Sequence, residues 1–269
     1  MPEEVANMKL KFYQVDAFTG APLRGNPAAV VLMKEWLSEQ TMQAIAAENN
    51  LSETAFIHPR GNAFEIRWFT PEVEVELCGH GTLASGFVVF EEGLAHGGEV
   101  QFATKVDVLT VRKDGRLYSM DFPAMPAEPV SIQDEVVDAL GCRPSALLAS
   151  RDLMAVFETE EEVAALRPRF DAVARLETLG VIATAPGRKV DFVSRFFAPG
   201  VGIPEDPVTG STHCTLVPYW SKRLGKKTLE ARQISRRGGE LHCEDRGERV
   251  GIAGEAVCYL RGEIEVPRS

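Results

Sequence analysis

The chain has 269 residues, of which 45% are apolar and 25% are charged, and these proportions are typical of a globular protein. Its formal net charge of −10 argues against a nucleic-acid backbone or an anionic membrane as the main partner. There is no signal-peptide pattern, no apolar run of transmembrane length and no disulfide pattern among the five scattered cysteines, so we expect a cytoplasmic protein.

Strands and helices are predicted in the first part of the chain from β-branched and aromatic content, apolar periodicity and capping residues. The predicted strands are 12–18, 28–33, 51–57, 63–69, 99–112 and 116–122, and the predicted helices are 38–48 and 82–90. The second of these helices is almost entirely apolar, which predicts a buried helix that ends at Gly93.

The second part of the chain follows a similar plan after a proline-rich stretch, FPAMPAEPV, at 122–130. The predicted strands are 146–149, 153–157, 179–185, 190–199, 229–236, 249–253 and 255–266. Helical segments are predicted at 159–176, interrupted by Pro168, and from Cys214 to about Gly225.

An internal repeat relates the two parts. When the sequence is shifted by 128 residues, positions 44–78 align with 172–206 without a gap, and ten of these 35 positions are identical. A repeat of this length indicates two similarly folded halves rather than a solenoid. We therefore predict an α+β fold of two pseudo-symmetric halves, each a curled, mostly antiparallel sheet wrapped around a central helix.

We place the N-terminal half at residues 1–122 and the C-terminal half at 131–269, with a linker at about 123–130. In this division the last predicted strand, 255–266, can cross back to the first half.

Glycine-rich turns precede both predicted central helices. The repeat aligns Cys78 with Asp206, and each is followed by small residues, Gly79–Thr82 in one half and Thr209–Thr212 in the other. Helix N-termini favour anions, and glycine lets a ligand approach the backbone. Two such turns suggest a binding site for a small anion in a cleft between the halves, whereas the simpler interpretation is that each turn only begins a buried helix.

Glu53 lies in a mostly apolar predicted strand, where its repeat partner is Val181. A partly desolvated carboxylate has a raised pKa and can take and return a proton near neutral pH. The alternative is an exposed glutamate on the solvent side of the strand.

Four further polar residues are candidates from their positions. His80 suits a general acid or base, or a polar residue at a helix start, and Ser211 suits a helix cap or a donor to substrate. Asn26 suits a ligand contact or an Asx turn, while His213 is expected to be buried and hydrogen-bonded rather than catalytic.

Two other kinds of site are disfavoured. Cys78, His80, His213 and Cys214 lack a usual structural-zinc spacing, so we predict no metal. A Cys78–His80 thiol hydrolase is disfavoured because neighbouring residues at a helix start rarely aim both side chains at one substrate atom.

The order of several motifs resembles the PhzF-like family of phenazine-biosynthesis isomerases and their relatives. These motifs are FYQVDAF at 12–18, GNPAAV at 25–30, LSETAF at 51–56, RWFTP at 67–71, CGHGTLAS at 78–85 and EDPVTGSTH at 205–213. The resemblance implies a diaminopimelate epimerase-like fold, a cofactor-free site between the halves and a homodimer.

The resemblance also implies roles for individual residues. Glu53 would shuttle a proton between substrate carbons, assisted by His80, Asp206 and Ser211. The substrate carboxylate would be held near the helix starts, for which we name Asn26, Cys78, Gly79, Gly81, Gly210 and Thr212 as substrate-binding residues. Related epimerases carry one cysteine at each helix start, whereas this chain pairs Cys78 with Asp206, which disfavours a two-thiol racemase.

The sequence thus predicts a cofactor-independent isomerase that moves a proton between carbons of a small carboxylate-bearing metabolite. Two alternatives stay open. One is an amino-acid or hydroxy-acid epimerase that uses Cys78, and the other is a small-molecule-binding or interaction protein of the same fold without turnover.

Overall fold

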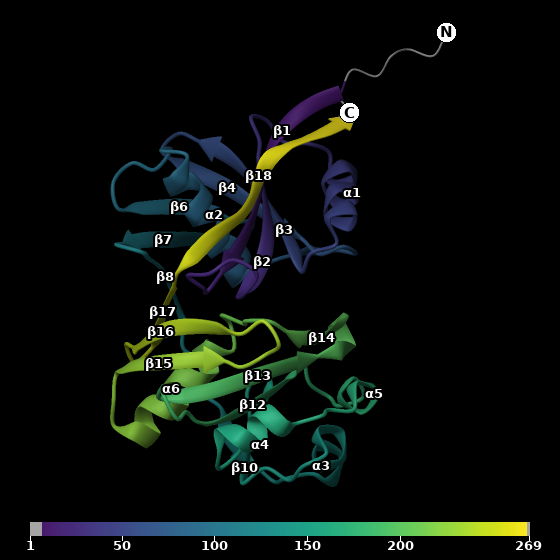
Figure 1. The fold of residues 1–269 in the computed structure, drawn as a ribbon, viewed down its shortest axis with the longest axis vertical. Helices are drawn as coiled ribbons and strands as arrows, with labels where there is room; N and C mark the ends of the chain where they lie inside the picture. The colour runs from purple at the N-terminus through teal and green to yellow at the C-terminus, as the bar shows by residue number, and fades with distance from the viewer. Residues whose placement is uncertain (1–6, 268–269) are drawn as a thin grey trace. The chain divides into compact units, whose positions relative to one another are not determined.

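The computed structural model describes residues 7–267 and divides into two compact units. Unit 1 comprises the described residues up to Met120 and from Glu255 onward, and unit 2 comprises Asp121–Gly254. In Figure 1 unit 1 carries the purple and blue ribbon with the yellow final strand, and unit 2 carries the green ribbon.

Unit 1 contains nine strands and two helices within the described residues, β8 extending past its boundary. They are β1 (Asn7–Ala17), β2 (Asn26–Leu32), α1 (Glu39–Asn49), β3 (Glu53–Arg60), β4 (Ala63–Phe69), β5 (Glu74–Val75), α2 (Gly79–Glu91), β6 (Glu99–Ala103), β7 (Val108–Asp114), β8 (Leu117–Pro123) and β18 (Ala256–Pro267), together with the turns between them.

Unit 2 is built from shorter elements. They are β9 (Glu128–Val130), α3 (Asp134–Leu140), β10 (Ala146–Ala149), β11 (Leu153–Val156), α4 (Glu160–Ala165), α5 (Phe170–Val173), β12 (Val181–Pro186), β13 (Phe192–Ala198), the 3₁₀ turn η1 (Pro199–Val201), β14 (Ile203–Asp206), α6 (His213–Leu224), β15 (Thr228–Gln233), β16 (Gly239–Asp245) and β17 (Arg249–Gly254).

The strand pairings within the two units follow one topology. In unit 1, β18, β1 and β2 are antiparallel, β2 runs parallel to β3, β3 pairs antiparallel with β4, and β4 runs parallel to β6. In unit 2, β9, β10 and β11 are antiparallel, β11 runs parallel to β12, β12 pairs antiparallel with β13, and β13 runs parallel to β15. This shared order confirms the predicted pair of similarly folded, mostly antiparallel halves.

Helix α2 is the central helix of unit 1. All its residues from His80 to Val89 are buried, because the helix has no polar face and must be covered on all sides. Gly86 lets it approach β7 closely, since a Cβ there would lie 2.6 Å from a methyl carbon of Val111. The helix starts at Gly79, three residues earlier than the sequence analysis placed it.

Helix α6 is the corresponding helix of unit 2, and it contains an interior proline, Pro218. Proline has no N–H, so the carbonyl four residues earlier, that of Cys214, lacks its helical partner. The backbone N–H of Met125 donates to this carbonyl at 2.9 Å. The helix therefore continues through the proline and ends at Gly225, which adopts the left-handed conformation.

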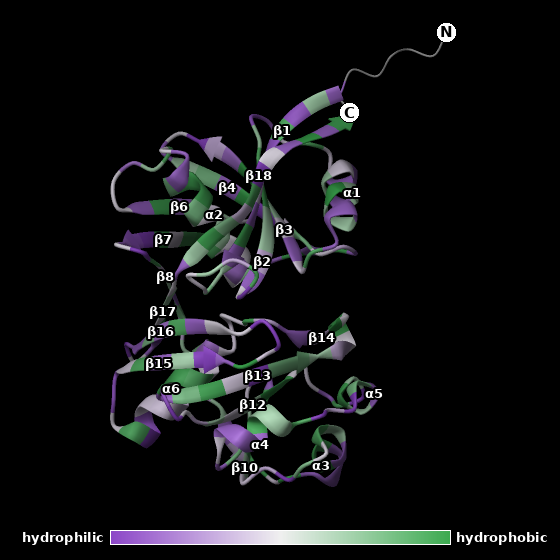
Figure 2. Cartoon of the chain, in the orientation of Figure 1, coloured by the Kyte–Doolittle hydropathy of each residue, from purple (hydrophilic) through white to green (hydrophobic). Residues whose placement is uncertain are grey.

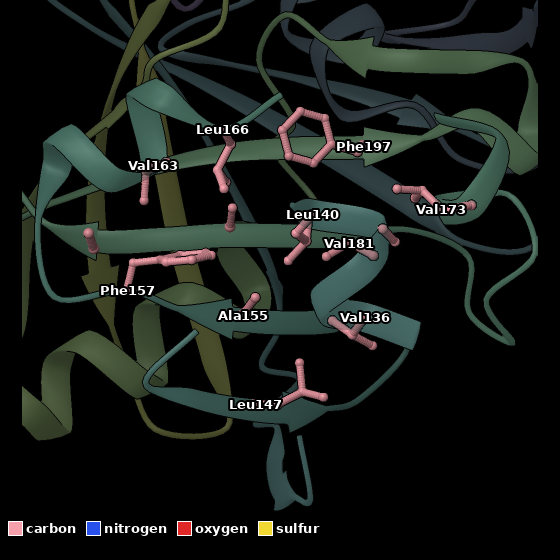
Figure 3. Packing of buried hydrophobic residues seen from close by; sticks show 14 of the residues in the cluster. Val136, Leu140, Leu147, Ala155, Phe157, Val163, Leu166, Val173, Val181 and Phe197 are labelled. Carbon is pink, nitrogen blue, oxygen red and sulfur yellow. The ribbon is translucent and has the colours of Figure 1, made fainter. Parts of the chain in front are cut away.

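A hydrophobic core lies between the short helices of unit 2 and its sheet. Figure 3 shows Val136 and Leu140 of α3 and Val163 of α4 pointing toward side chains of the strands, including Val181 and Phe197. All five side chains are essentially inaccessible to solvent. The core explains why α3 to α5 are short yet ordered, because each contributes a few apolar residues to one cluster.

The last strand crosses back to the first. β18 pairs with β1 along its length, from Asn7↔Pro267 to Ala17↔Ala256. Figure 2 shows both apolar and polar residues along β18, whose middle, residues 259–263, is exposed on both faces. Val266 and Ile264 lie against the core that α1 covers.

Several elements were not predicted. The stretch 123–130 is more than a linker, since it includes β9, which pairs with β10. α3, β5, β14 and β16 were also missed, because they are short or polar and carry little periodic signal. Among residues 7–267 no helix is long and apolar enough to cross a membrane, and the five cysteines are free thiols.

Candidate active site

The start of α2 is organised by Cys78. Its extended backbone ends the loop after β5, and its Sγ accepts a hydrogen bond from the Gly81 N–H at 3.3 Å, which makes Cys78 the N-cap of the helix. The hydroxyl of Thr82 donates to the Cys78 carbonyl at 2.6 Å. No acceptor is found within residues 7–267 for the backbone N–H groups of Gly79 and His80, which leaves two donors at the positive end of the helix.

Glu53, His80 and Cys78 come together at this helix start. Glu53 is the first residue of β3, paired with Ala28 of β2, and only 13% of its side chain is exposed. The His80 Nε2 lies 3.1 Å from the Glu53 Oε2, and the Cys78 Sγ lies 3.6 Å from the His80 Nδ1. The alternative of a solvent-exposed Glu53 is therefore wrong.

The charges in this cluster follow from its burial. Burial acts to raise the pKa of Glu53, but the positive charge of His80 at 3.1 Å, with Cys78 close by, lowers it below its ordinary value of 4.5. Burial acts to lower the pKa of His80, but the carboxylate of Glu53 beside it and the hydrogen-bond contact with Cys78 raise it above 6.5. Burial raises the pKa of Cys78, so this residue is a neutral thiol near neutral pH. The raised pKa predicted for Glu53 is thus wrong, because His80 outweighs burial.

Gly81 is required by its surroundings. A Cβ at this position would lie 2.9 Å from the Cys78 Sγ and 3.1 Å from the Trp68 ring. Trp68 of β4 is itself buried, and its indole N–H has no hydrogen-bond partner among the described residues. Trp68 was not predicted to be a site residue, since an aromatic residue in a strand is typical of the hydrophobic core.

The residues that precede α6 in unit 2 form a different hydrogen-bond network. Asp206, at the end of β14, accepts a short hydrogen bond from the Thr209 hydroxyl. The buried amide of Gln233 donates to the Asp206 carbonyl at 2.8 Å and accepts from the Thr209 N–H at 2.9 Å. Gln233 was not predicted, because it comes from a strand 27 residues away in sequence.

Ser211 and Thr212 occupy the turn that begins α6. Thr212 is the N-cap residue, without a side-chain capping bond, and its hydroxyl donates to the Thr209 carbonyl at 2.9 Å. Ser211 does not cap the helix, contrary to one of its predicted roles. Its Oγ accepts a hydrogen bond from Arg151 Nη2 at 3.1 Å.

The two helix starts correspond less closely in the structure than the alignment of Cys78 with Asp206 in the sequence repeat indicated. Cys78 directly precedes α2, whereas Asp206 lies seven positions before His213, the first residue of α6. His213 is fully buried, its Nδ1–H donates to the Thr209 carbonyl at 2.9 Å, and burial lowers its pKa to about 4. The prediction that His213 is buried and hydrogen-bonded is confirmed. Asn26 begins β2 and is fully buried.

The cluster of Glu53, Cys78 and His80 also offers metal-ligating atoms, one from each residue, within 4.8 Å of one another. Thiolate, imidazole and carboxylate groups are the usual ligands of zinc. Both ring nitrogens of His80 face another member of the cluster, so an ion would have to replace one of these contacts. The arrangement suits proton exchange within the cluster at least as well as metal binding.

Comparisons with known proteins place the chain in a family. The family model described as "Phenazine biosynthesis-like protein" matches residues 15–262. An uncharacterized isomerase of Pseudomonas aeruginosa is 51% identical over 260 residues, which cover 96% of this chain and 100% of that protein.

Solved structures agree with the sequence comparisons. A crystal structure of a phenazine biosynthesis protein of the PhzF family from Enterococcus faecalis superimposes with a TM-score of 0.95 at 46% identity, covering 96% of this chain and 100% of that one. A hydroxyproline epimerase from Agrobacterium vitis shares the fold, with a TM-score of 0.62 at 8% identity, covering 100% of this chain and 95% of that one. The chain therefore belongs to the phenazine biosynthesis-like (PhzF) family, as its motifs led us to expect.

Proposed function

We propose that this protein is a cofactor-independent isomerase that moves a proton between two carbons of a small carboxylate-bearing metabolite, with Glu53 as the proton carrier. The observation that carries the proposal is the buried Glu53–His80 contact of 3.1 Å beside the start of α2. Membership in a family with relatives named as isomerases supports the reaction class.

The geometry supports a simple division of roles. Glu53 is ionised near neutral pH, so it can accept a proton from a substrate carbon that a carboxylate or a neighbouring double bond makes acidic. The Glu53 carboxyl group would then return this proton to a second carbon. The unpaired N–H groups at the start of α2 would stabilise negative charge that develops on the substrate.

Asp206, Ser211 and the turn around Gly210 are proposed to orient the substrate, as the family motif implies. Binding of the substrate between the two halves, the homodimer and the cytoplasmic location stay predictions. Proton transfer through Glu53 needs no metal, so we expect the purified protein to hold no stoichiometric zinc and to keep its activity after treatment with a chelator.

Deuterium incorporation tests the proposed reaction directly. The protein is incubated in D₂O with a panel of amino, hydroxy and unsaturated carboxylic acids, and label is located by NMR. Label on a carbon next to the one that loses its proton supports isomerisation. Label at the same carbon with inversion would instead indicate the epimerase alternative, in which Cys78→Ser should abolish activity.

Replacing Glu53 by glutamine should lower the rate of exchange by about 100-fold or more, because the amide cannot accept a proton. Glu99→Gln, which changes an exposed glutamate on β6, is the matched control and should leave the rate unchanged. Full activity of Glu53→Gln on an identified substrate would contradict the proposed role.

A further inference from the structure

Gln233 is the last residue of β15, and its backbone is fixed on both sides of the strand. It lies in register with Ser194 of β13 and with Gly239 of β16. Its side chain is fully buried, which is costly for an amide unless hydrogen bonds replace those to water. The hydrogen bonds of the Gln233 side chain go to Asp206 and Thr209.

The carboxamide of Gln233 bridges the two ends of the turn 206–209. Its Nε2 donates to the Asp206 carbonyl at 2.8 Å, and its Oε1 accepts from the Thr209 N–H at 2.9 Å. These are the two backbone groups that a β-turn joins directly, so the side chain stands between them. The orientation of the amide follows, because a carbonyl can only accept a hydrogen bond and a backbone N–H can only donate one.

This orientation decides where the Thr209 hydroxyl proton points. The second N–H of Gln233 Nε2 donates to the Thr209 Oγ1 at 3.1 Å, so the hydroxyl is an acceptor on that side. Its single proton goes to the Asp206 Oδ2, to which the hydroxyl donates in a short hydrogen bond. The Thr209 carbonyl is occupied separately, by Thr212 and His213. A directed chain of hydrogen bonds therefore runs from Gln233 through Thr209 to Asp206.

Unit 1 shows that the shared scaffold does not need a glutamine at this place. β4 and β6 run parallel in unit 1 as β13 and β15 do in unit 2. Because the repeat aligns position 64 with 192, the register of these pairs makes Thr104 correspond to Gln233. Thr104 is half-buried, and its hydroxyl donates within its own turn, to the Asp107 carbonyl at 2.9 Å. The reason for Gln233 therefore lies in the residues that it contacts in unit 2.

We propose that Gln233 is a positioning residue, which fixes the Thr209 hydroxyl as a donor to Asp206 and so holds this carboxylate in one orientation toward the substrate. This inference rests on the proposed function, in which Asp206 orients the substrate. A second hydrogen bond to the same turn, from the Ser235 hydroxyl to the Pro207 carbonyl at 2.7 Å, does not involve the Asp206 carboxylate. Ser235 therefore provides a matched comparison.

Crystal structures of variants test the geometry without any substrate. Gln233→Met nearly keeps the shape of the side chain but removes its donors and its acceptor. We expect the Thr209 hydroxyl to leave Asp206 in this variant and the carboxylate to change its rotamer, whereas Ser235→Ala should keep both. If Gln233→Met does not fold, Thr209→Val, which removes only the hydroxyl, should change the Asp206 rotamer. An unchanged Asp206 rotamer in the variant that folds would overturn the proposal.

Deuterium exchange on an identified substrate tests the consequence for the reaction. Gln233→Met and Thr209→Val should each lower kcat/KM by about tenfold or more, because a misplaced orienting group can cost about 100-fold. The double variant should lose no more than either single variant, since both changes break the same chain. Thr209→Ser keeps the hydroxyl and should stay within about threefold of the wild type. Losses that multiply in the double variant would contradict the proposal.

Two controls separate positioning from stability. Ser235→Ala loosens the same turn, and Gln133→Met makes the same substitution at an exposed position of unit 2. Both should keep the kcat/KM of the wild type. A glutamine with a merely structural role would lower only the amount of folded protein, so rates are compared per folded molecule, measured by circular dichroism. Full recovery of kcat/KM for Gln233→Met after this correction would contradict positioning.

The outcome can be separated from that of the proposed reaction. Glu53→Gln should lose deuterium exchange but keep the contact between Thr209 and Asp206 in its crystal structure. Gln233→Met should lose this contact and only part of the exchange. Full exchange in Glu53→Gln would therefore contradict the proton carrier alone, whereas an intact contact in Gln233→Met would contradict the role of Gln233 alone.

Discussion

At the scale of single residues, the charge state of Glu53 depends on its partner more than on its burial. A buried carboxylate by itself has a raised pKa. His80 lies 3.1 Å away and reverses this direction, so Glu53 is ionised near neutral pH and ready to act as a base. Cys78 completes the cluster as a neutral thiol, because its burial raises its pKa.

The contact with His80 predicts a specific pH dependence. In the wild-type protein the acidic limb of activity should lie below pH 4.5, because the pKa of Glu53 is lowered. In His80→Gln the burial of Glu53 is no longer opposed by a positive charge, so the limb should move above pH 4.5. The measurement is the rate of deuterium exchange between pH 3.5 and 8 on an identified substrate, with folding checked by circular dichroism at each pH. An unmoved limb would show that His80 does not set the pKa of Glu53.

At the scale of elements, the start of α2 combines capping with the candidate site. The Cys78 Sγ accepts from the Gly81 N–H, so this side chain stabilises the helix whether or not it takes part in chemistry. The helix itself has no exposed face, and its position is set by close packing rather than by amphipathicity.

Two substitutions at Cys78 separate these roles. Cys78→Ala removes the capping acceptor and should lower the free energy of unfolding by about 1 kcal/mol, whereas Cys78→Ser keeps an acceptor and should lower it less. Urea denaturation followed by circular dichroism measures the difference. Under the isomerase proposal Cys78→Ser also keeps its activity. Equal loss of stability in both variants would contradict the capping role.

Gly86 gives a second prediction for the same helix. Glycine to alanine in a helix interior usually stabilises a protein by up to about 1 kcal/mol. Here the new methyl would lie 2.6 Å from Val111, so Gly86→Ala should instead destabilise by about 1–3 kcal/mol. Thermal denaturation of Gly86→Ala, of Val111→Ala and of the double variant tests this, since the double variant removes the two methyl groups near the new Cβ and should lose less stability than the two single variants summed. A more stable Gly86→Ala would show that the helix can shift away.

At the scale of the whole molecule, the two units share one strand order although their shared sequence is limited. Two parallel pairs, β2 with β3 and β11 with β12, recur at corresponding places, with Ala28↔Glu53 and Leu153↔Val181 in register. The same scaffold therefore carries a carboxylate in unit 1 and valine in unit 2. This contrast supports a chemical rather than a structural reason for Glu53.

The pairing of the chain ends predicts the effect of a truncation. A chain that stops at Glu255 loses β18, and with it the partner strand of β1 and the core contacts of Ile264 and Val266. Amides of β1 should then exchange with solvent faster, whereas amides of β12 and β13 should keep their protection. Hydrogen exchange followed by mass spectrometry measures both, with Tyr259→Ser, an exposed position on β18, as the control. Unchanged protection of β1 would contradict a structural role for β18.

Local patterns were sufficient to predict much of the fold. The repeat, the buried central helices and the glycine-rich turns follow from composition and spacing, which are properties of contiguous segments. The buried position of Glu53 was also proposed from sequence, because a carboxylate in a mostly apolar strand is unusual. The short elements α3 and β9 were missed, since their few apolar residues become meaningful only when they join a core built from distant segments.

The amino-acid sequence by itself determined the two-fold repeat and the residue types at both helix starts. Only the tertiary structure decided which of these side chains meet and with what charge. His80 sets the pKa of Glu53 from 27 positions away, and Arg151 reaches Ser211 across 60. The physical reason is that electrostatic and hydrogen-bond energies depend on distances of a few ångströms, which the folded chain fixes and sequence separation does not.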